Sequence, residues 1–272
     1  MKELSLKEIQ EHSLKVLLHV HEFCLSHDIQ YSIAYGTLIG AVRHKGFIPW
    51  DDDVDIIMTR ENFERFLKEY QSGGNYKLVS PNDKNSFLAF ARVCDIKETI
   101  VVSDIPWSKY DTGIWVDIFP MDSVDDDIEK HRLRFNRIQS EWLRLLYARN
   151  KMRSLSSSRN LMYLFKFIAK RILVLNGHVL SKRLQRYLNE ITDKSYLTSS
   201  HCAQLACCDE FGFYEKKDFE EYTMIEFERH QLMVNKEYDK MLRLLYGDYM
   251  QLPPVEDRIP KQLSIGYKFY QR

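Results

Sequence analysis

Four of the five residues from Asp51 to Asp55 are aspartates. Repulsion among carboxylates this close normally needs a cation to offset it. Mg²⁺ fits, with Mn²⁺ as the alternative, because Mg²⁺ favours carboxylate oxygens and completes its shell with water and substrate phosphates. Alternation in a strand sends Asp53 and Asp55 to one face, so we predict that these two are catalytic metal ligands. Asp52 is expected to face solvent, and Asp51 is left open between a supporting acid, a third ligand and a helper base.

A third carboxylate is expected from the segment Gly113–Pro120, which alternates as a strand does. This alternation places Asp117 on the same face as Trp115 and Phe119. An acid inside so apolar a strand is costly unless something binds it, so Asp117 is the candidate third catalytic ligand. The simpler alternative for the acidic run is a solvated turn. The run leads directly into an apolar strand, where acids without a binding partner are costly, and this favours the metal site.

Upstream of the acidic run, Gly36-Thr37 is predicted to open a turn that can bind an anion. Glycine lets backbone N–H groups approach phosphate oxygens, and the start of a following helix favours negative charge. The basic triplet Arg43, His44 and Lys45 could neutralise a diphosphate. An exposed surface loop is the alternative for the triplet, and for Lys45 it carries nearly equal weight.

Helices and strands must hold these residues in place. The sequence pattern of the front half predicts both, in mixed order along the chain. Apolar residues at three- and four-residue steps predict an amphipathic helix over residues 5–27. Thr59 is the expected cap of a helix over residues 60–70. The predicted strands are Tyr31–Tyr35, Val54–Met58, Lys77–Val79, Phe87–Val93 and Thr99–Val102, with a short helix at Leu38–Arg43.

The back half is predicted to be helical. Helices are expected over Glu129–Arg149, Asn160–Thr192 and Asn235–Tyr246, with a serine-rich break at Met152–Ser158. Gly247 ends the last helix, and Pro253-Pro254 is the expected end of the folded body. We therefore predict a catalytic domain at residues 1–125 and an α-rich lobe at residues 126–272, which completes the active-site cleft and the acceptor site.

Composition excludes several classes of protein. With 272 residues, 44% hydrophobic and 13% aromatic, the chain is not globally disordered. The charged N-terminus does not resemble a signal peptide, and no stretch reaches the roughly 20 apolar residues of a membrane span. Five cysteines without a C-x-x-C pair favour a reducing compartment and free thiols over zinc ligands. The expected location is cytoplasmic.

The net charge of zero conceals a basic middle, because no acidic residue lies between Glu141 and Glu190. Within it, residues 161–188 combine an apolar stripe with lysines and arginines. This segment could lie peripherally on the anionic inner face of a membrane, or it could be a helix packed on the catalytic domain with solvated lysines. Nucleic acid is not an expected partner, because no nucleic-acid-binding motif is recognisable.

The sequence resembles the LicD family of phosphotransferases, within the nucleotidyltransferase-fold superfamily. The resemblance rests on three blocks in the family's order, Gly36–Asp55, Trp115–Asp122 and Tyr246–Met250 before Pro253-Pro254. It implies an α+β fold with a nucleotidyltransferase-like mixed sheet flanked by helices. It also implies transfer of phosphocholine from CDP-choline to a hydroxyl of a bacterial cell-surface glycan, such as a teichoic acid precursor or lipopolysaccharide, which is commonly lipid-linked. Fukutin-type relatives instead transfer ribitol phosphate from CDP-ribitol.

By the same resemblance, Asp53 and Asp55 match the metal-binding acid pair and Asp117 matches the third carboxylate. The acceptor hydroxyl would attack the distal phosphorus in line, CMP would leave, and Asp117 would either ligate the metal or take the acceptor proton. Arg43 and Arg92 are the candidates for holding the diphosphate, because a guanidinium matches phosphate bidentately, with a surface strand residue as the alternative for Arg92. Gly36-Thr37 departs from the superfamily's usual Gly-Gly or Gly-Ser, but agrees with the LicD variant. A nucleotidyltransferase that delivers NMP from an NTP and a non-enzymatic glycan-binding relic of the fold are the competing hypotheses.

Overall fold

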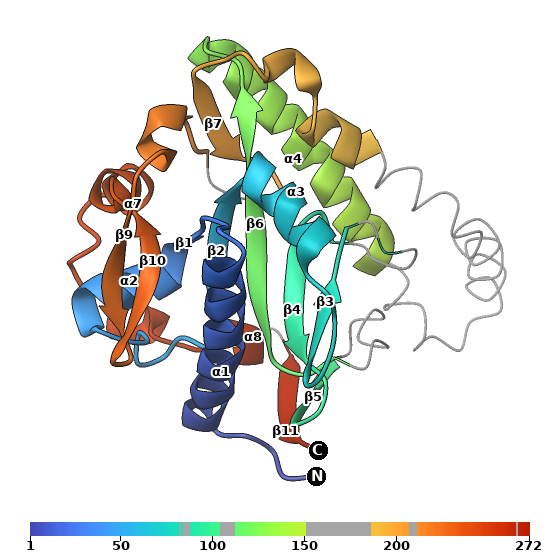
Figure 1. Ribbon diagram of the computed structural model, residues 1–272, viewed down its shortest axis with the longest axis vertical. Coiled ribbons are helices and arrows are strands. Elements are labelled where there is room, and N and C mark those ends of the chain that lie inside the picture. Colours follow the sequence, from blue (N-terminus) through green and yellow to red (C-terminus); the bar gives the residue numbers. More distant parts are fainter. Residues whose placement is uncertain (82, 84–87, 104–111, 151–185, 207–210, 265) are drawn as a thin grey trace, which may run out of the picture.

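The fold is built on a seven-stranded mixed sheet (Figure 1). The computed structural model describes residues 1–272 apart from 82, 84–87, 104–111, 151–185, 207–210 and 265, and apart from the side chains of 144–150. The main path of the sheet runs β1-β2-β6-β4-β3, and β7 and β8 extend it from β6. The strands are β1 (Ser32–Ile33), β2 (Asp55–Thr59), β3 (Tyr76–Val79), β4 (Ala91–Asp95), β6 (Trp115–Val124), β7 (His201–Gln204) and β8 (Tyr214–Glu215).

Strand β6 is the centre of this sheet. It pairs in parallel with β2 and antiparallel with β4 and β7, and most of its ten residues are buried. A strand covered on both faces is expected to be apolar nearly throughout, as Val116, Ile118 and Met121 are. The predicted strand Gly113–Pro120 is thus confirmed and extended to Val124. Residues from both halves of the chain meet along β6.

Helices α1 (Leu6–Ser26) and α3 (Arg60–Glu69) cover one face of the sheet, with α1 in front in Figure 1. Helix α1 begins with a capping box in which Ser5 and Glu8 satisfy each other's backbone N–H groups. Helix α3 is capped by Thr59, whose Oγ1 accepts from the backbone N–H of Asn62 at 3.4 Å. Both predicted helices are confirmed within one or two residues, because strong caps and apolar faces define them.

The remaining described elements surround the sheet. Helix α4 (Ile128–Asn150) confirms the predicted helix and packs Phe135 and Ile138 near Val124 and Ala203. Helix α2 (Tyr35–His44) contacts β9 of the β9–β10 hairpin. The other elements are β5 (Thr99–Ser103), β9 (Tyr222–Phe227), β10 (His230–Asn235), α7 (Tyr238–Tyr246), α8 (Lys261–Ser264), β11 (Tyr267–Gln271) and the 3₁₀ turns η1 (Lys194–Tyr196), η2 (Lys216–Phe219) and η3 (Val255–Asp257).

The back half differs from the prediction, because its described part contains strands β7 to β11 as well as helices. Strand β7 joins the central sheet through β6, and β11 pairs with β5 from the front half. The structure therefore does not confirm a separate α-rich lobe, and the division at residue 125 stays a prediction. The predicted helix Asn160–Thr192 and the break Met152–Ser158 lie outside the described residues, except for a helical end from residue 186.

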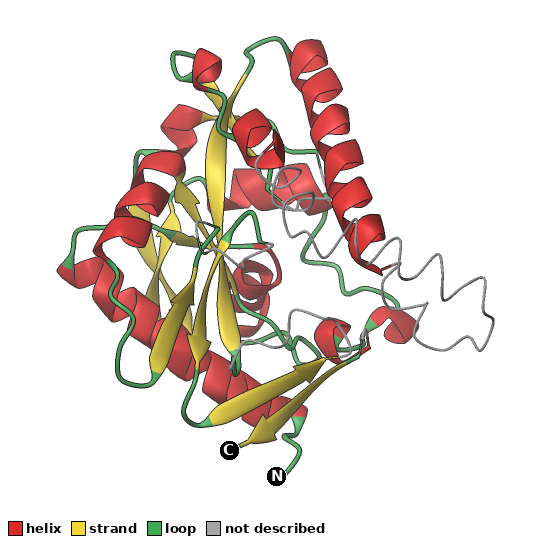
Figure 2. Cartoon of the chain, turned by 90° about the vertical axis from the view of Figure 1, so that its right-hand side faces the viewer, coloured by secondary structure: helices red, strands yellow, loops and turns green. Residues whose placement is uncertain are grey.

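Pro253-Pro254 does not end the folded body, which corrects the prediction. Beyond it, α8 leads into β11, which lies beside β5 next to both chain ends (Figures 1 and 2). Tyr267 and Phe269 alternate inward from β11 and are buried, and this two-residue period is the signal of a strand. The last residues of the chain are thus part of the core.

Two boundaries also shift in ways that matter for the site. Helix α2 begins at Tyr35 rather than Leu38, so Gly36-Thr37 lies in its first turn instead of a preceding loop. Strand β4 runs over Ala91–Asp95 instead of starting at Phe87, which lies outside the described residues. No helix in the described part of the chain is both long enough and apolar enough to span a membrane.

Gly40 in α2 should not tolerate a side chain. A Cβ at this position would lie 2.4 Å from the backbone oxygen of Gly46 and 3.1 Å from the backbone nitrogen of Ile48. We expect Gly40→Ala to lower the free energy of unfolding by about 1–3 kcal/mol despite alanine's better helix propensity, because backbone cannot yield as a side-chain end can. Urea unfolding measures this. Gly73→Ala is the matched control, since a Cβ there meets nothing within 4 Å. Equal stabilities of the two variants would contradict the packing.

Candidate active site

The parallel pairing of β2 and β6 brings Asp55 and Asp117 side by side. They are register partners, and the backbone N–H of Asp117 donates to the carbonyl of Val54 at 2.9 Å. Burial raises the pKa of Asp55 well above its usual value, and the charges of Asp53, Asp117 and Asp51 raise it further. Four acids from two regions of the chain therefore interact electrostatically, and we call Asp51, Asp53, Asp55 and Asp117 the acid cluster.

Asp51 and Asp53 form the outer part of the acid cluster. Together with Asp52 they offer carboxylate oxygens that all lie within 4.8 Å of one another. Burial, followed by the charge of Asp53 and a hydrogen bond with it, raises the pKa of Asp51 to about 8. In the absence of a cation, Asp51 is therefore expected to hold a proton at neutral pH.

Asp52 is not solvent-facing, which corrects the sequence-based expectation. It is 4% exposed, and its two carboxylate oxygens accept the backbone N–H groups of Gln262 at 3.0 Å and Leu263 at 2.9 Å. Burial raises the pKa of Asp52, while these two hydrogen bonds oppose the rise. The side chain of Gln262 continues to the acid cluster, where its Nε2 donates to Oδ2 of Asp53 at 3.1 Å.

Gly36 and Thr37 shape the other side of the cluster. A Cβ at position 36 would lie 2.5 Å from Oδ2 of Asp51, so glycine allows this carboxylate to approach the start of α2. The positive end of the helix dipole favours an anion there. The hydroxyl of Thr37 accepts the backbone N–H of Asp55 at 3.0 Å and so holds the start of β2. Binding of donor phosphate by Gly36 and Thr37 stays a prediction.

Arg92 lies against Asp117 on the neighbouring strand β4. Its Nε donates to Oδ1 of Asp117 at 2.5 Å and its Nη2 to Oδ2 at 3.1 Å, and Nε1 of Trp115 also donates to Oδ2 at 3.1 Å. The guanidinium carbon lies 4.4 Å from the centre of the Trp115 ring. Burial still raises the pKa of Asp117, although Arg92 opposes the rise. The structure thus gives Arg92 a protein partner, and its contact with the donor diphosphate stays a prediction.

The basic triplet lies at the opposite end of α2 from the acid cluster. Nη1 of Arg43 donates to the backbone oxygens of Tyr249 at 2.8 Å and Gln251 at 3.3 Å, and its Nε contacts Nε2 of His44 at 2.9 Å. Lys45 is exposed and closes the helix in a left-handed conformation with φ of 59°. The structure therefore does not bring these three side chains to the acids, and their contacts with substrate stay predictions.

The acid cluster fits a divalent metal. Among the described residues, the cations that lower the pKa values of its members are Arg92, next to Asp117, and Lys261, near Asp51. A hard cation such as Mg²⁺ or Mn²⁺ prefers carboxylate oxygens as ligands. The carboxylates that lie within 4.8 Å of one another are those of Asp51, Asp52 and Asp53. The assignment of Asp53, Asp55 and Asp117 to one metal stays a prediction.

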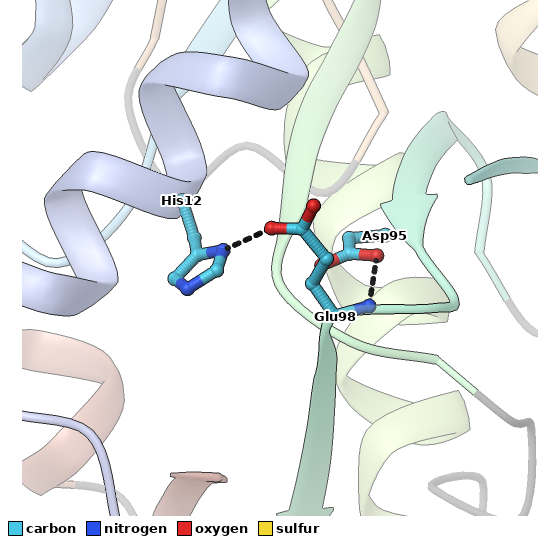
Figure 3. A group of neighbouring side chains, drawn as sticks. All are labelled: His12, Asp95 and Glu98. Atoms are coloured by element: carbon cyan, nitrogen blue, oxygen red, sulfur yellow. Dashed lines mark hydrogen bonds and ion pairs between the residues drawn. The ribbon is translucent and has the colours of Figure 1, made fainter. Parts of the chain in front are cut away.

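A second group of potential metal ligands, His12, Asp95 and Glu98, is explained by the fold (Figure 3). Asp95 accepts the backbone N–H groups of Lys97 at 2.9 Å and Glu98 at 3.0 Å and the hydroxyl of Thr99 at 2.9 Å. Glu98 is paired with Lys15 at 2.8 Å. These contacts stabilise the turn between β4 and β5, so the group needs no metal.

The pKa of Asp51 predicts how stability depends on pH in metal-free buffer. The unfolded chain loses this proton near pH 3.8, whereas the folded chain keeps it up to about pH 8. The folded state therefore binds more protons in this window, and the contribution of Asp51 to stability falls as the pH rises through it. Ionised Asp51 adds negative charge beside the proposed metal ligands, so the rise in melting temperature on adding Mn²⁺ should be larger at pH 8.5 than at pH 6. Calorimetry tests this, and an equal rise at both pH values would contradict it.

Comparisons with known proteins agree with this geometry. Residues 28–149 match a family model described as LicD/FKTN/FKRP, nucleotidyltransferase domain, and this range contains the whole acid cluster. Lipopolysaccharide cholinephosphotransferase LicD of Haemophilus influenzae is 31% identical over 98% of this chain and 99% of its own length. An uncharacterized protein of Rickettsia typhi is 40% identical over 22% of this chain and 20% of its own, and one of Rickettsia prowazekii is 38% identical over 22% and 24%.

Proposed function

The chain is a transferase of the LicD family, and from this premise we propose that it moves phosphocholine from CDP-choline to a hydroxyl of a bacterial cell-surface glycan precursor, releasing CMP. The observation that supports this most is the acid cluster, in which the register of β2 and β6 sets Asp55 beside Asp117. The full-length similarity to a lipopolysaccharide cholinephosphotransferase supports phosphocholine as the transferred group and a glycan as the acceptor. Lipopolysaccharide-type and teichoic-acid-type precursors, free or lipid-linked, are the acceptors to test.

We assign Asp53, Asp55 and Asp117 to a Mg²⁺ ion, with Mn²⁺ as the alternative. When bound, such an ion neutralises diphosphate oxygens and stabilises charge on the leaving group. The chain's own contribution is to fix these acids in place. Both oxygens of Asp117 accept hydrogen bonds from Arg92 or Trp115, so this carboxylate cannot rotate freely and suits a fixed ligand.

Asp51 is our candidate for the group that takes the proton from the acceptor hydroxyl. Its pKa of about 8 in the metal-free protein shows that it can bind a proton near neutral pH, and a bound cation nearby would lower this pKa and favour the ionised form that accepts a proton. Its neighbour Asp53 accepts from Gln262 and is thereby held in place. The carboxylate of Asp51 lies next to the first turn of α2, where the missing side chain of Gly36 leaves space for it.

Two other donors share the same chemistry. Another CDP-linked alcohol phosphate, such as CDP-ribitol, would use the same metal ligands and the same leaving group. A nucleotidyltransferase reaction would instead deliver NMP from an NTP and release pyrophosphate. Membrane contact through residues 161–188 stays a separate prediction, because residues 161–185 lie outside the described part of the chain.

Nucleotide products distinguish these reactions. Purified protein is incubated with Mg²⁺, with CDP-choline, CDP-ribitol or CTP, and with candidate glycans, and the released nucleotides are separated by chromatography. The proposal expects CMP from CDP-choline, dependent on both Mg²⁺ and acceptor, and no CMP from Asp53→Asn. CMP from CDP-ribitol alone would change the donor, and pyrophosphate from CTP would identify a nucleotidyltransferase.

A further inference from the structure

We propose that Gln262 is a positioning residue for Asp53 and that α8 (Lys261–Ser264) and β11 (Tyr267–Gln271), together the C-terminal segment, are structural components of the acid cluster. The inference rests on the proposed metal-dependent function and names residues that the sequence analysis placed beyond the folded body. Gln262 lies more than 200 positions from Asp53 in the chain, yet its amide donates to that carboxylate at 3.1 Å.

Asp52 fixes the main chain of this segment. Its buried carboxylate accepts two successive backbone N–H groups, from Gln262 and Leu263, which orients the start of α8. With the backbone held in this way, the side chain of Gln262 extends to Asp53 and donates to its Oδ2. The two hydrogen bonds to Asp52 also explain why this residue is buried although its neighbours in the sequence are acids.

The segment reaches the other side of the acid cluster through β11. Tyr267 and Phe269 are buried against Trp115, with ring centres 5.3 Å and 5.8 Å from the indole. Trp115 in turn donates to Asp117. The C-terminal segment therefore contacts Asp53 directly, through the amide of Gln262. It reaches Asp117 only indirectly, by packing on Trp115, which donates to that carboxylate. Pairing of β11 with β5 anchors the segment, and the backbone N–H of Gln271 also donates to the carbonyl of Lys2 at 3.0 Å.

A donor bound to one oxygen of a carboxylate fixes the direction of the other oxygen. Partners of this kind around metal ligands typically change metal affinity or activity by about 10–100-fold when they are removed. Gln262 is uncharged, so it can fix Asp53 without competing with a metal for the negative charge. Lys261, by contrast, lowers the pKa of Asp51 through its charge.

The test uses the full-length protein and Mn²⁺ alone, with binding measured by electron paramagnetic resonance. We expect Gln262→Met to weaken Mn²⁺ binding about tenfold or more, because methionine keeps the length of the side chain but cannot donate. Gln262→Asn keeps the amide but shortens its reach, and it should weaken binding similarly. Gln271→Met is the matched control, since this exposed glutamine belongs to β11 and lies outside the acid cluster; the Mn²⁺ affinity of this variant should match wild type.

Thermal unfolding in metal-free buffer separates positioning from folding. The inference expects both Gln262 variants to melt within a few degrees of wild type while their Mn²⁺ affinity falls. It is overturned if they bind Mn²⁺ as wild type does while Asp53→Asn does not, or if affinity falls only together with the melting temperature. If wild type itself binds no Mn²⁺, the metal dependence of the proposed function fails too, and this result is distinct from the first.

Discussion

Replacing Asp55 by asparagine is expected to reduce phosphocholine transfer by about 10³-fold or more while leaving the metal-free protein at least as stable as wild type. A bound metal typically contributes several kcal/mol to stabilising the transition state, and each 1.4 kcal/mol changes the rate about tenfold. Asn has nearly the same shape but lacks the charge. Because burial and three neighbouring acids already disfavour ionisation of Asp55, removing the charge also removes repulsion.

Asp122→Asn is the matched control for Asp55→Asn. Asp122 is also a buried aspartate, on β6, but it is paired with Arg60 at 2.7 Å and 2.9 Å and lies outside the acid cluster. Its replacement should lower stability, because it removes the buried charge that pairs with Arg60 and leaves Glu64, at 3.1 Å, as the acidic partner of this arginine. Turnover and urea unfolding of both variants are the measurements. If Asp55→Asn keeps its activity and loses stability, the assignment of this residue to a metal is wrong.

Arg92→Met is expected to destabilise the protein by about 3–5 kcal/mol, because it leaves Asp117 buried without the bidentate partner that holds its charge. The pKa of Asp117 should rise further, since Arg92 opposes the effect of burial more strongly than the hydrogen bond from Trp115 does. Transfer activity should fall strongly as well, because a carboxylate that has lost its orientation is a poorer ligand.

The double variant Arg92→Met/Asp117→Asn tests this assignment. Removing both charges should restore much of the lost stability without restoring activity, and the difference measures the coupling between the two residues. A role limited to holding donor diphosphate predicts a different pattern, in which Arg92→Met raises the KM for CDP-choline and leaves stability unchanged. Chemical unfolding together with steady-state kinetics distinguishes the two.

The acid cluster could be predicted in part from the sequence, because its signals are local. The run of carboxylates that contains Asp53 and Asp55, and an acid inside an apolar strand, Asp117, are visible without a structure. The expected strand alternation of Asp53 and Asp55 is wrong, because β2 begins at Asp55 and Asp53 lies before it. The helices α1 and α3 could be predicted from local signals too, since Ser5 and Thr59 cap them next to clear apolar faces. Each of these predictions depends on a pattern within about ten neighbouring residues, which can be read from the sequence alone.

Long-range contacts could not be predicted in this way. The pairing of Arg92 with Asp117 follows from the antiparallel register of β4 on β6, which no local pattern specifies. The burial of Asp52 depends on Gln262 and Leu263, which lie about 210 residues further on, so the local pattern wrongly predicts a solvent-facing acid. The strands β7 and β11 depend on pairing with β6 and β5 of the front half, and no local pattern specifies that pairing.

The measurement that tests the central claim most directly follows both halves of the donor. CDP-choline labelled with tritium in the choline methyl groups and with carbon-14 in the cytidine is incubated with the protein, Mg²⁺ and a lipopolysaccharide-type or teichoic-acid-type acceptor. We expect tritium to enter the glycan while carbon-14 appears in CMP, and both to fall by about 10³-fold or more in Asp55→Asn. Carbon-14 in the glycan, or undiminished transfer in Asp55→Asn, would contradict this claim.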